Sequence, residues 1–209
     1  MEGEATVQAT PDQATVRFGV VTRADAPEAA REENGETSSA AMEAARAADV
    51  PEDQIQMDQL QLRPRRVYDE ERRRTVEQGF EAIRTVRVTL NEVDRVPVLV
   101  AAVIEAGANR VQSVEYGLQD RTEVRNQALE EAAQNAREKA ERLAAALDVQ
   151  IGAVRSIQEQ HFSFPRVSQV DRARATMMNE AAEDANPEAY APGTIDVEAR
   201  VAVVFDLDQ

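Results

Sequence analysis

The stretch DRTEVRNQALEEAAQNAREKAERLAAAL, residues 120–147, predicts a long helix with one apolar face. Asp120 and Glu123 have the spacing of a capping box, which satisfies free amides at the start of a helix. The apolar residues recur every three or four positions, as they do along one face of a helix; they are Val124, Ala128, Ala132, Ala136, Ala140, Leu143 and Leu147. Because alanine dominates this stripe, we expect the helix to lie close against a sheet.

Strand patterns lie on both sides of this helix. In residues 195–205 every second side chain is apolar, which predicts a strand with one buried face. Residues 5–9 and 14–20 alternate in the same way on either side of a Thr-Pro-Asp-Gln turn. Two alternating runs around such a turn favour a hairpin, and we expect these two segments to pair.

A second hairpin is predicted from residues 55–65 and 80–90, which are separated by a charged loop at 66–77. After the long helix, the regular pattern is lost over residues 159–193, where prolines punctuate a polar stretch. Long segments without periodicity are usually surface loops. We therefore expect a long surface excursion at about 159–193.

Two further helices and two short strands complete the chain. We expect helices from Asp25 to about Ala48 and from Asn91 to about Glu105, and strands at 111–118 and 151–157. Gly107 is placed to end the second helix in a left-handed conformation. The order ββ-α-ββ-α-β-α-β-β predicts an α+β fold, with an antiparallel or mixed sheet of hairpins and helices packed on one face. We expect residues 1–209 to form a single domain.

Composition excludes several classes of function. Among 209 residues there is no cysteine, so the chain has no disulfide, thiolate nucleophile or cysteine-based metal site. The formal net charge of −15 argues against nucleic acid as a partner, because affinity for nucleic acid comes mainly from Lys and Arg on phosphates. The longest apolar run, Val96 to Ile104, is far shorter than the ~20 residues that span a bilayer.

The charged residues themselves favour adaptation to high salt. Acidic residues outnumber basic ones by 39 to 24, and Lys139 is the one lysine. A GC-rich genome would also favour arginine codons, but codon bias alone does not account for so acidic a chain. The chain begins on polar residues after Met1, and we expect it to be a mature form from which a signal peptide has been removed.

Candidate catalytic and metal-binding residues are few. His161 is the one histidine, so a Ser-His-Asp triad would have to use it, and a zinc site is not expected. Its neighbours Phe162 and Phe164 favour a residue that packs beside aromatic rings. The acidic groups at 69–71 and 180–184 lack the alternating ligands and glycine of a calcium loop. We therefore predict no catalytic, cofactor-binding or metal-binding residues.

One basic cluster stands out in this acidic chain, in and around the predicted loop at 66–77. Its members are Arg63, Arg65, Arg66, Arg72, Arg73 and Arg74. One interpretation is an interaction patch that binds an acidic surface, such as that of another copy of this chain. The other is an exposed loop whose arginines pair with Asp69, Glu70, Glu71 and Glu77, and surface pairs of this kind contribute little energy.

Several short motifs occur one after another along nearly the whole chain. They are Gly3 and Val7, Pro11-Asp12-x-Ala14, Leu62-x-Pro64, Tyr68, Gly79-Phe80-x-Ala82, Gly107-Ala108-Asn109-Arg110-Val111, the helix from Ala128 to Ala144, and Pro192-Gly193. In this order they resemble the SIMPL-domain family, long described as a domain of unknown function, which includes periplasmic immunogenic proteins. Asp49 and Asp148 depart from it, because relatives often carry glycine there.

The resemblance implies export to the periplasm or cell exterior and a tendency to self-associate, and it brings no accepted catalytic residues. We therefore expect an exported, non-enzymatic interaction or scaffold protein that forms homo-oligomers or binds a protein partner. The alternative is a periplasmic small-molecule or ion-binding protein that uses the excursion at 159–193 as a lid. An enzyme is the third possibility.

Overall fold

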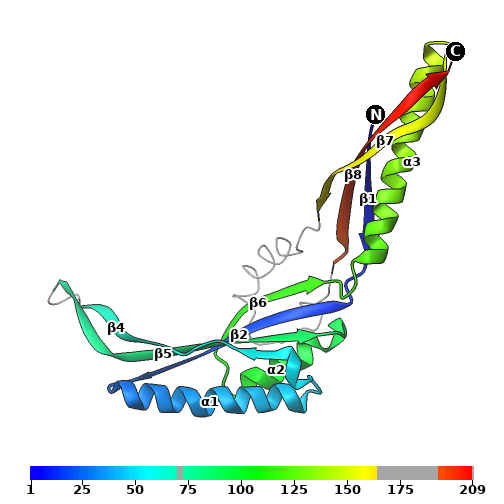
Figure 1. The fold of residues 1–209 in the computed structure, drawn as a ribbon. Coiled ribbons are helices and arrows are strands. Elements are labelled where there is room, and N and C mark those ends of the chain that lie inside the picture. Colours follow the sequence, from blue (N-terminus) through cyan, green and yellow to red (C-terminus); the bar gives the residue numbers. More distant parts are fainter. Residues whose placement is uncertain (70–72, 164–192, 209) are drawn as a thin grey trace. The chain divides into compact units, whose positions relative to one another are not determined.

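The computed structural model describes residues 1–69, 73–163 and 193–208, which form two compact units (Figure 1). Among the described residues, unit 1 contains 1–11, 117–163 and 193–208, and unit 2 contains 12–69 and 73–116. Each unit has its own hydrophobic core and its own sheet. None of the described helices is both long enough and apolar enough to cross a membrane.

Unit 1 is a three-stranded antiparallel sheet with one helix on one face. The strand order is β1 (Glu2–Ala9), β8 (Ile195–Asp208) and β7 (Gln150–Ser163), and helix α3 (Thr122–Ala146) packs on β1 and β8. The core joins the inward side chains of β8 to an alanine stripe on the helix, formed by Ala128, Ala132, Ala136, Ala140 and Ala144.

Gly3 shows how close the helix lies to the strand. A Cβ atom at Gly3 would overlap the carbonyl oxygen of Ala132 and come within 2.6 Å of the amide nitrogen of Ala136. The helix also donates side-chain hydrogen bonds to the β1 backbone, from Asn135 to the Glu4 carbonyl at 2.9 Å and from Lys139 to the Glu2 carbonyl at 3.2 Å. The predicted close packing of an alanine face on a sheet is confirmed.

Both ends of α3 depart from the sequence pattern. At the start the N-cap is Arg121, so the predicted capping box of Asp120 and Glu123 does not form. Asp120 instead accepts a hydrogen bond from the Thr122 amide at 2.8 Å, and this bond lowers the pKa of the Asp120 carboxyl. At the other end the buried stripe continues to Ala144, while Leu143 and Leu147 are 51% and 70% exposed. Because a helical turn takes 3.6 residues, alanines spaced four residues apart advance steadily around the helix. By Ala144 the buried face has therefore turned away from Leu143 and Leu147. The assignment of these two leucines to the buried face is therefore wrong.

Unit 2 is a five-stranded sheet covered by two helices. Its path is β3 (Ile55–Met57), β5 (Arg74–Leu90), β2 (Gln13–Ala24) and β6 (Arg110–Gly117), and β4 (Gln61–Asp69) also pairs with β5. Helices α1 (Pro27–Ala47) and α2 (Val96–Glu105) follow β2 and β5, and short 3-10 turns cover Glu52–Gln54 and Val93–Arg95. The pairs of β5 with β2, β3 and β4 are antiparallel, which confirms the α+β fold class.

A buried amide fixes α1 on the sheet. The Asn34 side chain is fully buried and donates to the Val20 carbonyl at 2.9 Å and to the Ala82 carbonyl at 3.1 Å, which lie on neighbouring strands. The helix begins at Pro27 with Ala26 at the N-cap, two residues after the predicted start at Asp25. Gly107 has φ +105°, and Asp49 and Asp148 have φ +55°, so the three helices end in left-handed conformations.

The predicted first hairpin is wrong. Strand β1 pairs with β8, from Glu2 opposite Ala202 to Ala9 opposite Ile195, while β2 pairs with β5. The two strands therefore belong to different sheets. The alternation of apolar residues marks which face of a strand is buried, but it carries no information about the strand beside it.

The second hairpin is confirmed, although the predicted strand at 55–65 is divided into β3 and β4. The paired residues extend to Asp69 opposite Arg74, so the connecting turn is shorter than the predicted loop at 66–77. Strand β7 likewise extends to Ser163 and includes the first residues of the predicted excursion at 159–193. The rest of that excursion, residues 164–192, lies outside the described residues. The single-domain assignment of residues 1–209 stays a prediction.

Candidate interaction surfaces

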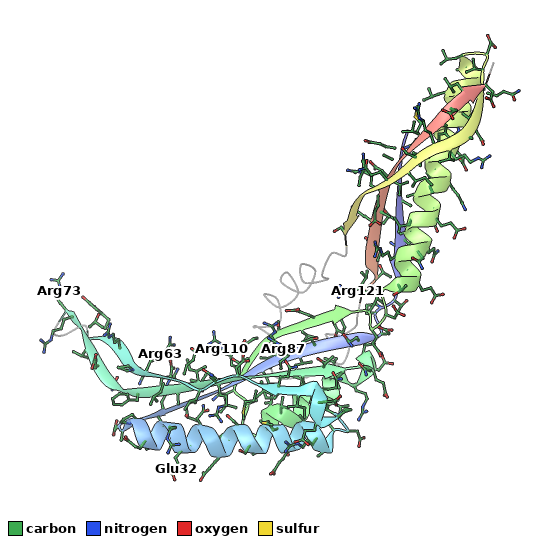
Figure 2. The ribbon with its side chains drawn as sticks, in the orientation of Figure 1. Glu32, Arg63, Arg73, Arg87, Arg110 and Arg121 are labelled. Atoms are coloured by element: carbon green, nitrogen blue, oxygen red, sulfur yellow. The ribbon has the colours of Figure 1, made fainter. Side chains whose placement is uncertain are left out.

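The β4–β5 hairpin carries the arginine cluster identified in the sequence. Arg63, Arg65 and Arg66 lie on β4, Arg74 begins β5, and Arg73 lies in the turn with φ +49° (Figure 2). Arg72 lies outside the described residues. The structure thus brings five of the six arginines onto one hairpin.

Two of these arginines pair with acidic residues of the same sheet. Arg63 donates to Oε2 of Glu81 through Nη2 at 2.8 Å and Nε at 3.1 Å, and Arg23 of β2 contacts Oε1 of the same carboxylate at 3.1 Å. The hydrogen bond from Arg63 is the main cause that lowers the pKa of Glu81. Arg66 lies 3.5 Å from Glu77, and both side chains are well exposed, so this pair contributes little.

The remaining arginines of the hairpin have no acidic partner among the described residues. Arg65, Arg73 and Arg74 form no ion pair with any part of the chain that the structure describes. Asp69, Glu70 and Glu71, the partners that the alternative interpretation needs, have side chains outside the described residues. The interaction patch therefore stays a prediction, with Arg63 already engaged within the fold.

The predicted absence of catalytic and metal-binding residues also stays a prediction. His161 lies in β7 opposite Arg200, but its side chain is outside the described residues. Within residues 1–69, 73–163 and 193–208, no three His, Cys, Asp or Glu side chains gather in a way that could hold a metal ion.

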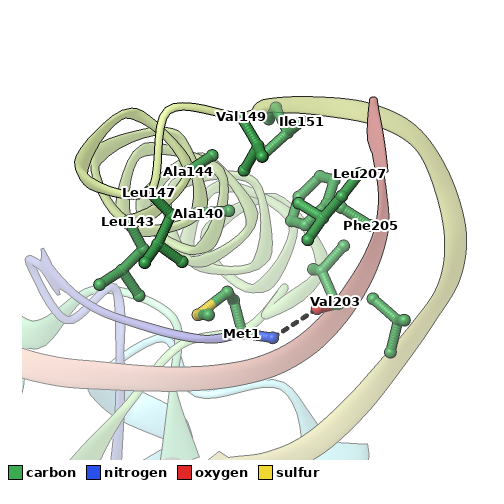
Figure 3. Close-up of a pocket in the computed structure, with 11 residues that line it drawn as sticks. Met1, Ala140, Leu143, Ala144, Leu147, Val149, Ile151, Val203, Phe205 and Leu207 are labelled. Atoms are coloured by element: carbon green, nitrogen blue, oxygen red, sulfur yellow. Dashed lines mark hydrogen bonds between the residues drawn. The ribbon is translucent and has the colours of Figure 1, made fainter. Parts of the chain in front are cut away.

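A second surface, which the sequence did not reveal, lies at one end of unit 1. We call it the apolar end (Figure 3). It is a pocket of about 240 Å³ lined by Met1, Ala140, Leu143, Ala144, Leu147, Val149, Ile151, Val203, Val204, Phe205 and Leu207. Every lining side chain is apolar, and Leu147 and Leu207 are 70% and 61% exposed.

The strands β1 and β7 border β8 to different residues at the apolar end. Strand β1 pairs with β8 as far as Ala202, and Met1 exchanges backbone hydrogen bonds of 2.6 and 2.7 Å with Val203. Strand β8 continues to Asp208, paired with β7 up to Gln150. On its other side, residues 204–208 of β8 have no neighbouring strand among the described residues.

The lining of the apolar end suits contact with another apolar surface. Contiguous exposed apolar residues on an otherwise polar protein mark a site of interaction. No ionisable side chain lines the pocket, and the Met1 ammonium beside it donates to the Val203 carbonyl. The sequence contained one indication of this surface: Leu143 and Leu147 do not follow the four-residue spacing of the alanines. Helical periodicity alone could therefore have placed them beside the buried face.

Comparisons with known proteins match this chain over nearly its whole length. The family model SIMPL, described as "Protein of unknown function (DUF541)", matches residues 1–205. "Uncharacterized protein YggE" of Edwardsiella ictaluri is 29% identical over 211 residues, which cover 99% of this chain and 85% of that protein. "Uncharacterized protein YggE" of Escherichia coli strain K12 is 28% identical over 206 residues, with 99% and 81% covered.

Proposed function

Because the chain belongs to the SIMPL family of proteins of unknown function, we propose that it is an exported, non-enzymatic interaction protein that assembles with copies of itself. The observation that carries this proposal is the apolar end of unit 1. Export rests on the resemblance to family members of the periplasm. The non-enzymatic role is supported by an apolar end that carries no ionisable side chain.

Burial of the apolar end would supply the driving force for assembly. Leu143, Leu147 and Leu207 are all more than half exposed. Full burial of one such side chain contributes about 1.5–3 kcal/mol relative to full exposure, so burying what remains exposed on three of them contributes several kcal/mol. This gain must exceed the entropy lost when two molecules associate.

One edge of β8 adds a second source of affinity. Among the described residues, no strand lies beside 204–208 on this edge, which presents its backbone groups next to the apolar pocket. An extended segment of another copy would pair with this edge and place apolar side chains in the pocket, which is how strand addition combines affinity with specificity.

Net charge opposes assembly at low salt. Each copy carries −15, so two copies repel each other until counterions screen them. The screening length is about 10 Å at 0.1 M ionic strength and about 3 Å at 1 M. Assembly should therefore strengthen as KCl increases.

Light scattering of two variants tests the proposal. Leu147→Asp places a charge in the apolar end, and Val98→Asp places one at an equally exposed apolar residue, 63% exposed, on α2 of unit 2. We expect the wild type and Val98→Asp to reach the same multiple of the monomer mass, and Leu147→Asp to remain monomeric. A monomeric wild type at all protein concentrations, or loss of assembly in Val98→Asp alone, would show that the proposal is wrong.

The second candidate function is the binding of a small molecule, which the apolar pocket favours. A dry apolar cavity of about 150 Å³ binds a molecule of the size of benzene, and the pocket here is larger, at about 240 Å³. The lid expected at 159–193 falls mainly on residues outside those described. A rise in melting temperature with small apolar compounds, lost in Leu147→Asp, would favour this function over assembly.

A further inference from the structure

The open face of the unit 2 sheet carries an unusual pair of arginines. In β2, the residues Ala14, Val16, Phe18 and Val20 are fully buried in the core, so Arg17 projects from the opposite face. Arg17 is directly opposite Arg87 of β5 in the antiparallel register, and the two side chains therefore share that face. Like charges directly opposite each other destabilise a sheet.

Both arginines also carry an unsatisfied donor. The Nε atoms of Arg17 and Arg87 are buried and have no hydrogen-bond partner, and neither residue forms an ion pair among the described parts of the chain. Nη1 of Arg87 donates to the Gln56 side chain on β3 at 3.2 Å. Buried donors of this kind are rare in folded proteins, because each one left unpaired costs free energy. Arg84 shares the feature, but it is opposite buried Val20 and so belongs to the other face.

Further donors surround this pair. Gly19, two residues after Arg17, lies against β6, where its absent side chain would come within 3.6 Å of the Arg110 Cβ and 3.3 Å of the Gln112 Nε2. Gln112 reaches across Gly19 to donate to the Thr85 hydroxyl at 3.1 Å. Arg110 is exposed and has no acidic partner among the described residues. Figure 2 shows Arg87 and Arg110 on the side of the sheet away from α1.

We propose that Arg17, Arg87 and Arg110 form a binding site for a phosphate group. A phosphate carries close to two negative charges at neutral pH and several acceptor oxygens, so it can neutralise two arginines that share one face of a sheet. Planar guanidinium groups donate two parallel hydrogen bonds to such an anion. The neighbouring Arg23 and Arg63 are already neutralised by Glu81, which leaves this part of the face as a local positive site on a chain of net charge −15.

Thermal unfolding with inorganic phosphate tests the site. Phosphate should raise the melting temperature of the wild type in a saturable manner, compared with KCl at the same ionic strength, because a ligand of the folded state stabilises it. Arg17→Gln and Arg87→Gln should each weaken the apparent affinity for phosphate by about ten-fold or more. Arg142→Gln, which breaks an exposed ion pair with Glu138 on α3, is the matched control and should leave the affinity unchanged.

The same variants have a second signature without phosphate. Arg17→Gln removes a like-charge contact, so its melting temperature in phosphate-free buffer should rise by about 1–3 °C, whereas loss of a merely structural arginine would lower it. Glycerol 3-phosphate should replace inorganic phosphate if the natural ligand is a phosphate ester. If KCl at matched ionic strength reproduces the whole effect, if malonate binds as tightly as phosphate, or if Arg142→Gln loses the response equally, the assignment is overturned.

Discussion

Two glycine-to-alanine substitutions should change stability in opposite directions. At Gly3 the added methyl group would overlap the backbone of α3, where the Ala136 amide nitrogen lies 2.6 Å from the Cβ position. Backbone atoms of a packed helix cannot move aside separately, so α3 must shift from β1. At Gly35, within α1, the same methyl group meets no atom within 4 Å.

The magnitudes follow from packing and helix propensity. Overpacking in a core lowers the free energy of unfolding by about 1–3 kcal/mol. Replacing glycine with alanine reduces the entropy of the unfolded chain, which raises the free energy of unfolding by less than about 1 kcal/mol. Gly3→Ala should therefore lower the free energy of unfolding by about 1–2 kcal/mol. Gly35→Ala should raise it by about 1 kcal/mol, because alanine is the better helix former.

Urea unfolding followed by circular dichroism measures both changes. The opposite signs provide an internal control, because the chemical change is the same in each variant. If Gly3→Ala is as stable as the wild type, β1 does not lie against α3 as described, and the account of the alanine stripe is refuted.

Three further predictions concern the core, acid and salt. Val203→Asp should abolish folding of unit 1, measured by loss of the cooperative thermal transition, because Val203 is 3% exposed and an unpaired charge would be buried there; a native melting curve would contradict this. Arg63 and Arg23 lower the pKa of Glu81 below its ordinary value of 4.5. The Glu81 carboxylate therefore stabilises the fold above that value, and this stabilisation is lost as the pH falls through the lower pKa of the folded state. Glu81→Gln should therefore unfold with a shallower pH dependence below about pH 4.5 than the wild type, and an unchanged slope would show that this carboxylate is not stabilised in the fold. The melting temperature should rise between dilute buffer and about 2 M KCl, because salt screens the repulsion within a chain of net charge −15. A flat or falling melting temperature would indicate that codon bias, and not salt adaptation, explains the composition.

Local periodicity predicted the elements that carry the cores. The alternation in residues 195–205 corresponds to the buried face of β8, and the alanine spacing corresponds to the buried face of α3. These patterns succeed because burial imposes a period on the residues of each element separately. The order of these elements predicted the α+β fold class, and the family that the motifs resemble is confirmed by the SIMPL model over residues 1–205.

Local periodicity does not predict which strands pair with each other. The residues around Pro11 resemble a hairpin turn, yet β1 and β2 join different sheets, and β1 pairs with a strand that begins at Ile195. A pairing across so many residues depends on the whole arrangement of the unit, which no local window of sequence contains.

The candidate sites depend on this same long-range register. The sequence identified the arginines of the β4–β5 hairpin as a group, but the bond from Arg63 to Glu81 exists because these residues are opposite each other in the sheet. The juxtaposition of Arg17 with Arg87 arises from the register of β2 and β5. The apolar end could be foreseen only in part, through the position of Leu143 and Leu147 on the helix.

The protection of a single thiol in the apolar end tests the central proposal of assembly most directly. The chain has no cysteine, so Leu147→Cys introduces one thiol in the pocket and Val98→Cys introduces one on α2 as a control. Its rate of alkylation by iodoacetamide is measured in about 1 M KCl, where charge repulsion is screened, at increasing protein concentration. We expect the rate to fall with concentration in Leu147→Cys and to stay constant in Val98→Cys. A rate in Leu147→Cys that does not change with concentration would contradict assembly through the apolar end.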